Sequence, residues 1–302
     1  MNKLQEHSKP KQIQFNNNPF SLAFNEMSKA FKINQNPAVV IIVGAIVIAV
    51  ANQIFGNVPS FLDSINENTK SNSLSTTITA FSSIFVLVFF IASIFVSTVW
   101  AGFVGLIGVS NAKDESVHVQ ASFRASLSKF WTILGINLMI GLVSVALLMP
   151  SAIIALVGVG LLSADLNVIA VLAFVFSGLL FIGGIVLAVR YSLARNLSLY
   201  AVFDESLSAF PAMKRSATLT KKRLIETWGM SFPGTIIPIV GPLLATCGLG
   251  AHYLQLKVYK DSSAELPKVH ILSWLPVMLI VAGFLLVGFV GAVIALIAIS
   301  NN

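Results

Sequence analysis

His252 and Tyr253 are neighbouring ionisable side chains at the end of a long apolar run, 227–256. Ionisable groups inside a membrane are costly, and they commonly hold an ion or relay a proton. A histidine and a tyrosine near the end of an apolar segment also suit the membrane–water interface. We therefore expect this pair to lie at the interface and not in a catalytic centre.

No other residues of the chain have the types and spacing that catalysis requires. HExxH, GxSxG and the glycine-rich phosphate loop are all absent from the sequence. Every Asp and Glu lies in a polar segment, so no pair of acids is available within an apolar run. The four histidines have no ligand-like spacing. The sequence therefore predicts a protein that is not an enzyme and that uses no metal or cofactor.

The composition is that of an integral membrane protein. Of the 302 residues, 56% are hydrophobic and 10% are charged, whereas soluble domains carry about 25% charged residues. A span needs roughly 20 apolar residues without a charge. We expect an all-α, multi-pass protein of the cell membrane, with six transmembrane helices at about 38–56, 78–109, 131–160, 168–189, 228–256 and 270–299.

The remaining chain organisation follows from these spans. Residues 1–18 are polar and predicted to be disordered. Residues 19–302 are expected to form a single membrane domain. Cys247 is the one cysteine, so no intrachain disulfide can form.

The distribution of Lys and Arg predicts the orientation. The N-terminal segment and the loops 110–129 and 190–226 are rich in Lys and Arg, whereas 57–77 and 161–167 hold one Lys between them. Because basic loops stay inside, the N-terminus is expected to be cytoplasmic. The net charge of +7 comes mainly from that side, which favours contact with anionic lipid headgroups and not with nucleic acid.

The loop 257–268 does not fit simple alternation, because it carries three lysines on the side predicted to face out. The preceding segment contains Pro233, Pro238 and Pro242, which interrupt helices. Either 228–256 spans fully, which we favour, or it forms a re-entrant hairpin that returns to the cytoplasm. In the second case the C-terminus lies outside.

Each cytoplasmic segment contains an amphipathic stretch that suits a helix at the interface. Apolar residues recur at helical spacing on one face, in the sets Phe20, Phe24, Met27, Phe31; Val119, Phe123, Leu127, Phe130; and Leu207, Phe210, Met213, Ala217. Because two spans follow each stretch, we interpret 19–109, 117–189 and 206–299 as three copies of one unit, with chance similarity as the alternative.

The basic residues beside these stripes are the predicted lipid-headgroup contacts. They are Lys29, Lys32, Arg124, Lys129, Arg190, Lys214, Arg215, Lys221, Lys222 and Arg223. Arg190 ends the fourth span, so we expect it to reach lipid phosphate. It could also hold the following loop through Asp204 or Glu205.

The tract 190–228 resembles a pattern in a loosely related group of multi-span membrane families. That group includes the membrane domain found beside some glycerophosphodiester phosphodiesterases. The matching residues are Arg190 or Arg195, Asp204 or Glu205, and then Ala212, Ser216, Leu219, Thr220 and Lys221. Ala217 and Lys222 depart from the Trp and Gly common there. The resemblance implies a membrane domain without phosphodiesterase activity, because that chemistry belongs to a separate soluble domain.

These observations leave two functional hypotheses. We favour a non-catalytic, structural or lipid- and partner-binding membrane component. The alternative is a transporter or channel subunit that uses the proline-broken fifth span. Glycines in the second, fourth and sixth spans allow close helix packing, either within the chain or in a homo-oligomer.

Overall fold

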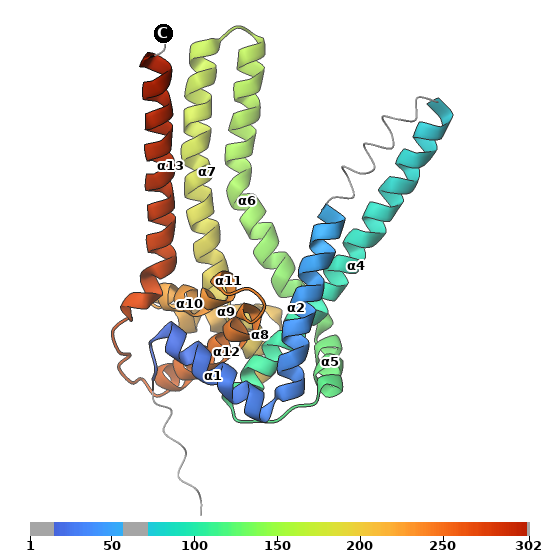
Figure 1. Cartoon of the computed structure of the whole chain (residues 1–302), viewed down its shortest axis with the longest axis vertical. Helices are drawn as coiled ribbons and strands as arrows, with labels where there is room; N and C mark the ends of the chain where they lie inside the picture. The colour runs from blue at the N-terminus through green and yellow to red at the C-terminus, as the bar shows by residue number, and fades with distance from the viewer. Residues whose placement is uncertain (1–14, 57–71, 301–302) are drawn as a thin grey trace, which may run out of the picture.

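A computed structural model describes residues 15–56 and 72–300, and all regular elements in these ranges are helices (Figure 1). They are α1 (Pro19–Ile33), α2 (Gln35–Gly56), α4 (Asn72–Ala112), α5 (Val119–Ser128), α6 (Phe130–Ser163), α7 (Asn167–Arg195), α8 (Ser198–Asp204), α9 (Ala209–Thr220), α10 (Leu224–Ser231), α11 (Pro233–Ile236), α12 (Gly241–Asp261), the 3-10 helix η1 (Ile271–Trp274) and α13 (Leu275–Ser300).

Long apolar helices form one part of the molecule. In Figure 1, α2, α4, α6, α7 and α13 all extend away from a group of short helices, in the same general direction. Among the described residues, three helical stretches can cross a membrane by length and composition: Val86–Ala112, Phe130–Ser163 and Asn167–Asp204. The bent pair Pro19–Ile33 and Gln35–Ala51 is a fourth candidate if it is counted as one span. Large apolar side chains along them are exposed, which is the expected state of a surface that faces lipid.

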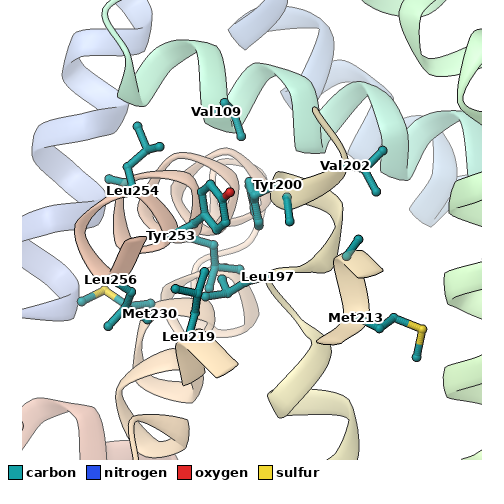
Figure 2. Packing of buried hydrophobic residues seen from close by; sticks show 14 of the residues in the cluster. Val109, Leu197, Tyr200, Val202, Met213, Leu219, Met230, Tyr253, Leu254 and Leu256 are labelled. Carbon is teal, nitrogen blue, oxygen red and sulfur yellow. The ribbon is translucent and has the colours of Figure 1, made fainter. Parts of the chain in front are cut away.

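Short helices form the second part, here called the base: α1, α5 and α8 to α12, with the residues that connect them (Figure 1). Its centre is α12, in which every residue from Thr246 to Leu256 is buried. Figure 2 shows Tyr253 of α12 beside Tyr200 of α8, with Val109 of α4 nearby. The two tyrosine rings lie 6.2 Å apart between their centroids.

The predicted fifth span, 228–256, is not one helix. It is interrupted at Phe232 and again at Ile237–Val240, where Pro233 and Pro238 cannot donate a backbone hydrogen bond. The α12 helix that follows packs against α1, α4 and α10. An apolar segment can be buried by protein as well as by lipid, and here the base surrounds it.

The 257–268 loop therefore belongs to the base, and its lysines lie at the same end of the long helices as the other basic segments. Arg215 of α9 forms an ion pair with Asp261, and the Asn17 side chain donates to the carbonyl of Lys268 at 2.6 Å. The second contact comes from Asn17, in the described part of the terminus that was predicted to be disordered. The rest of the predicted disordered terminus, 1–14, lies outside the described residues, as does 57–71.

Helices form at the three stretches predicted to be amphipathic, as α1, α5 and α9. Small side chains are buried on each of them, namely Ala23 and Ala30 in α1, Ser122 and Ser126 in α5, and Ala212 and Ser216 in α9, together with the larger Leu22, Met213 and Leu219. Of the large apolar residues in the predicted stripes, Phe24, Phe31, Leu127 and Phe210 are exposed, whereas Met213 is buried and Met27 and Phe123 pack against the core.

In the first two predicted units, the order of the helices agrees with the repeat prediction. In each of them a short helix precedes two long ones, α2 and α4 in the first unit and α6 and α7 in the second. In the third, α9 precedes the base helices α10 to α12 and a single long helix, α13. The third unit therefore lacks the predicted pair of spans.

Glycines allow α4 and α12 to cross closely. A Cβ on Gly250 would lie 2.2 Å from the carbonyl oxygen of Gly108, and one on Gly108 would lie 2.7 Å from that of Thr246. These atoms belong to backbone that other contacts hold in place. Larger residues at either glycine would force the two helices apart.

We expect Gly250→Ala to lower the free energy of unfolding by about 2 kcal/mol or more, because overpacked helices must shift. Chemical or thermal unfolding in detergent measures the change. Gly141→Ala in α6 is the matched control, because a Cβ there meets no atom within 4 Å. Equal effects from both substitutions would contradict the close crossing.

Candidate functional site

Asp204, at the end of α8, is the centre of a group of charged residues in the base. Its carboxylate is 3% exposed and lies 2.6 Å from Lys113 Nζ and 2.5 Å from Lys257 Nζ. The Tyr253 hydroxyl is 2.9 Å from the same carboxylate. Because these partners come from α12 and the residue after α4, Asp204 joins three parts of the base.

Glu205 extends this group to α9 and to the end of α12. Its carboxylate accepts hydrogen bonds from Tyr253 Oη at 2.7 Å and from Arg215 Nε at 3.0 Å. The Arg215 guanidinium also binds both carboxylate oxygens of Asp261, at 2.7 and 2.9 Å. We call this group the clamp, made of Lys113, Asp204, Glu205, Arg215, Tyr253, Lys257 and Asp261.

Charges balance within the clamp, which holds three carboxylates and three cationic groups. The hydrogen bond with Asp261 raises the pKa of Arg215 further above its ordinary value. Burial, with the adjacent Glu205 and Asp204, raises the pKa of Tyr253, so that its hydroxyl stays protonated as a donor. All members of the clamp are therefore occupied with one another, as expected for a structural connection between helices.

The residues that carry the family resemblance in α9 bind the C-terminal end of α7. The Ser216 hydroxyl donates to the Ala194 carbonyl at 2.9 Å and accepts from the Leu197 backbone N–H at 3.1 Å. Thr220 donates to the same carbonyl at 3.2 Å. Carbonyls in the last turn of a helix lack intrahelical partners, so the Ser-x-x-x-Thr spacing completes the end of α7.

A second polar group lies between α10 and α12. Glu226 is fully buried and pairs with Arg223 at 3.2 Å. The Thr227 hydroxyl donates to the Arg223 carbonyl, and His252 Nε2 is 3.3 Å from that hydroxyl. Because the Thr227 hydroxyl donates its proton to the Arg223 carbonyl, it accepts the hydrogen bond from His252, which requires the tautomer protonated at Nε2. His252 Nδ1 has no hydrogen-bond partner among the described residues.

Burial dominates the electrostatics of this second group. It lowers the pKa of His252 to about 3, with the positive charge of Arg223 contributing in the same direction. Burial also raises the pKa of Glu226, while Arg223 offsets part of that effect. Both His252 and Tyr253 are buried by protein within the base, and their position at the membrane interface stays a prediction.

A third polar group connects α1 to the end of α4. Lys29 lies 2.6 Å from Asp114 and 3.3 Å from Glu26. The Asn111 side chain donates to the backbone carbonyl of Glu26 at 3.0 Å. Nearby, Asn34 holds the bend of 118° between α1 and α2 by bonding the backbone of the 115–117 segment.

The predicted headgroup residues have three different environments. Lys32, Arg124, Arg190 and Lys214 are exposed, and Lys129 is partly exposed between α5 and α6. Lys29 and Arg215 are engaged in the ion pairs described above. Lys221, Lys222 and Arg223 converge on one cavity. The expected pairing of Arg190 with Asp204 or Glu205 was wrong, because those acids bind Lys113, Lys257 and Arg215 instead.

Sequence reasoning missed Lys113, Lys257, Lys260 and Lys268 as site residues. Three of them follow the apolar run 227–256, and their conflict with simple alternation was the available signal. Among the residues that the structure describes, no three His, Cys, Asp or Glu side chains lie close enough together to hold a metal ion. The arrangement is thus suited to joining helices and to binding charged groups at the surface of the base.

Removing the carboxylate at the centre of the clamp should leave Lys113 without its partner and Lys257 with Glu205 alone, at 3.7 Å. We expect Asp204→Asn to lower the free energy of unfolding by about 3–5 kcal/mol, the usual cost of breaking a buried pair. Asp165→Asn, at the exposed α6–α7 turn, is the control and should change it little. Unfolding in detergent at neutral pH measures both variants, and a small effect at Asp204 would contradict the clamp.

The neutral state of His252 should make stability depend on pH. The pKa is lower in the folded state than the ordinary 6.5, so the stabilisation is present above about pH 6.5 and lost as the pH falls toward about 3. The slope from this one group is about 1.4 kcal/mol per pH unit. Comparing unfolding across this window should show a pH dependence that is steeper in the wild type than in His252→Gln by about this slope, and the exposed His118→Gln should retain the wild-type dependence.

Comparisons of the chain with models of known protein families, with curated proteins and with solved structures find no match.

Proposed function

We propose that the protein is a non-catalytic integral membrane component that crosses the bilayer five times and holds its base against anionic headgroups of the cytoplasmic leaflet. In this position it acts as a structural or lipid- and partner-binding unit. One observation carries the proposal: the polar and charged helices gather at a single end of the long apolar helices (Figure 1).

The five proposed spans are α2, α4, α6, α7 and α13. The α2 helix has 22 residues and α13 has 26, and about 20 apolar residues suffice to cross the hydrocarbon core. An odd number of spans places the C-terminus opposite the N-terminus. It also places 257–268 beside 190–226, which removes the conflict between its lysines and the positive-inside rule.

Exposed aromatic residues at the edge of the base support its position at the bilayer surface. Trp131, at the start of α6, is 80% exposed, and Phe210 of α9 is 69% exposed. Aromatic side chains at the ends of spans favour the headgroup region. Exposed basic residues lie on α5, which precedes α6, and on α9, namely Arg124 and Lys214. An anionic leaflet would attract them.

The occupied carboxylates support a non-catalytic role. Asp204, Glu205 and Asp261 each bind cations of other segments, and Glu226 binds Arg223. General acid–base catalysis needs an ionisable group that can reach a substrate, whereas these groups hold helices together. On α7, Gly178 and Gly183 have open space around them, which suits packing against a helix of another membrane protein or a second copy.

The transporter or channel alternative has less support. It required an unwound segment among the spans, near the middle of the bilayer. The proline-interrupted residues 232–240 lie instead beside α1, α10 and α12 in the base.

Cysteine labelling tests the proposed arrangement. In a Cys247→Ala background, an impermeant maleimide applied to intact cells should label Asp165→Cys but not Ser208→Cys or Ser263→Cys. The latter two should react only after permeabilisation, because both lie on the base. Labelling of Ser263→Cys together with Asp165→Cys would contradict five spans and favour six.

The proposed contact with lipid headgroups is tested with purified protein in nanodiscs. The midpoint of thermal unfolding should be higher in phosphatidylglycerol than in phosphatidylcholine, and added salt should reduce the difference by screening. Equal midpoints in the two lipids would overturn the proposed headgroup contact.

A further inference from the structure

A basic cavity lies on the surface of the base, between the turn after α9 and the segment that leads to α13. Its volume is about 490 Å³. The turn contributes Lys221, Lys222 and Arg223, the end of α12 contributes Lys260, and the 265–269 segment contributes Glu265 and Lys268. The lining thus holds five cationic residues and one carboxylate.

This cavity differs from the clamp because its charges are not balanced. Arg223 has Glu226 as its partner. In the described part of the chain, none of the four lysines has a carboxylate within ion-pair distance. Burial lowers the pKa of Lys260, and the positive charges of Arg223, Lys221 and Lys222 lower it further. The lining of the cavity therefore carries an excess of positive charge, which Glu265 and Glu226 balance only in part.

Backbone contacts hold the walls of the cavity in place. The Lys260 ammonium donates to the carbonyls of Thr218 and Lys221, at 3.1 and 3.3 Å, and so joins α12 to the end of α9. On the opposite wall, Asn17 holds the carbonyl of Lys268. Because repelling charges would otherwise spread apart, these contacts keep the lysines converged.

We propose that this cavity binds a phosphate group, either the headgroup of an anionic phospholipid or a free phosphate. Ammonium groups form strong charge-assisted hydrogen bonds with phosphate oxygens. The cavity has room for a headgroup larger than phosphate itself. Its lining includes Val269, two residues before η1. The exposed Ile271 and Trp274 belong to η1, which precedes α13. The lipid source rests on the proposed function, since it requires the base to lie at headgroup level.

Binding is measured on the full chain in a neutral detergent, at constant ionic strength, by calorimetry. The probes are inorganic phosphate and dioctanoyl phosphatidylglycerol. We expect the Lys221→Gln/Lys268→Gln variant to weaken binding by about tenfold or more, because two of the converging charges are lost. Lys260 is left intact because it also joins two helices.

The control is Lys221→Arg/Lys268→Arg, which keeps both positive charges at the cavity and should change binding less than about threefold. Binding of both probes, or of the lipid alone, with loss only in the glutamine variant supports the site and identifies its source. If neither probe binds, or both variants weaken it equally, the cavity is not a phosphate site. The nanodisc comparison tests the headgroup contact separately, so either proposal can fail while the other stands.

Discussion

The close crossing of α4 and α12 at Gly108 and Gly250 is the constraint on which the base depends. With only hydrogen at both positions, the two backbones come into direct contact. Tyr253 and Lys257 follow Gly250 at positions i+3 and i+7, and so lie on the same face of α12. Lys113 follows Gly108 just beyond the end of α4. The crossing therefore brings both lysines and the tyrosine to Asp204.

This packing produces two kinds of charged region, which differ in the balance between acidic and basic groups. In the clamp, equal numbers of acidic and basic groups satisfy one another, which stabilises a fixed arrangement of helices. Around the cavity, four lysines and Arg223 outnumber Glu265, the one acid of the lining, at a cost in repulsion. Structural contacts seldom require such an excess of one sign, whereas an anionic ligand does.

The contacts within the base also explain why the apolar helix α12 is not one of the long helices that extend from it. The residues of α12 include Thr246, His252 and Gln255, whose polar groups would be costly in hydrocarbon. The Thr246 hydroxyl donates to the Pro242 carbonyl within α12 itself, whereas His252 has a partner on another helix, Thr227 of α10. Burial by a neighbouring helix thus gives His252 a polar contact that lipid would not.

The sequence by itself determined the membrane class, the positions of most long helices and the three short helices α1, α5 and α9, because charge-free length and helical periodicity are local properties. It also marked Asp204 and Glu205 as acids that could hold the loop, although it named the wrong partner for them.

Tertiary structure alone decided that α12 is enclosed by protein, since mainly apolar helices suit both lipid and a protein interior. It likewise decided that Ala23, Ser126 and Ser216 face inward while Phe24 and Phe210 face out. Close approach of helices selects small side chains, and a pattern of hydrophobicity does not record which neighbour comes close.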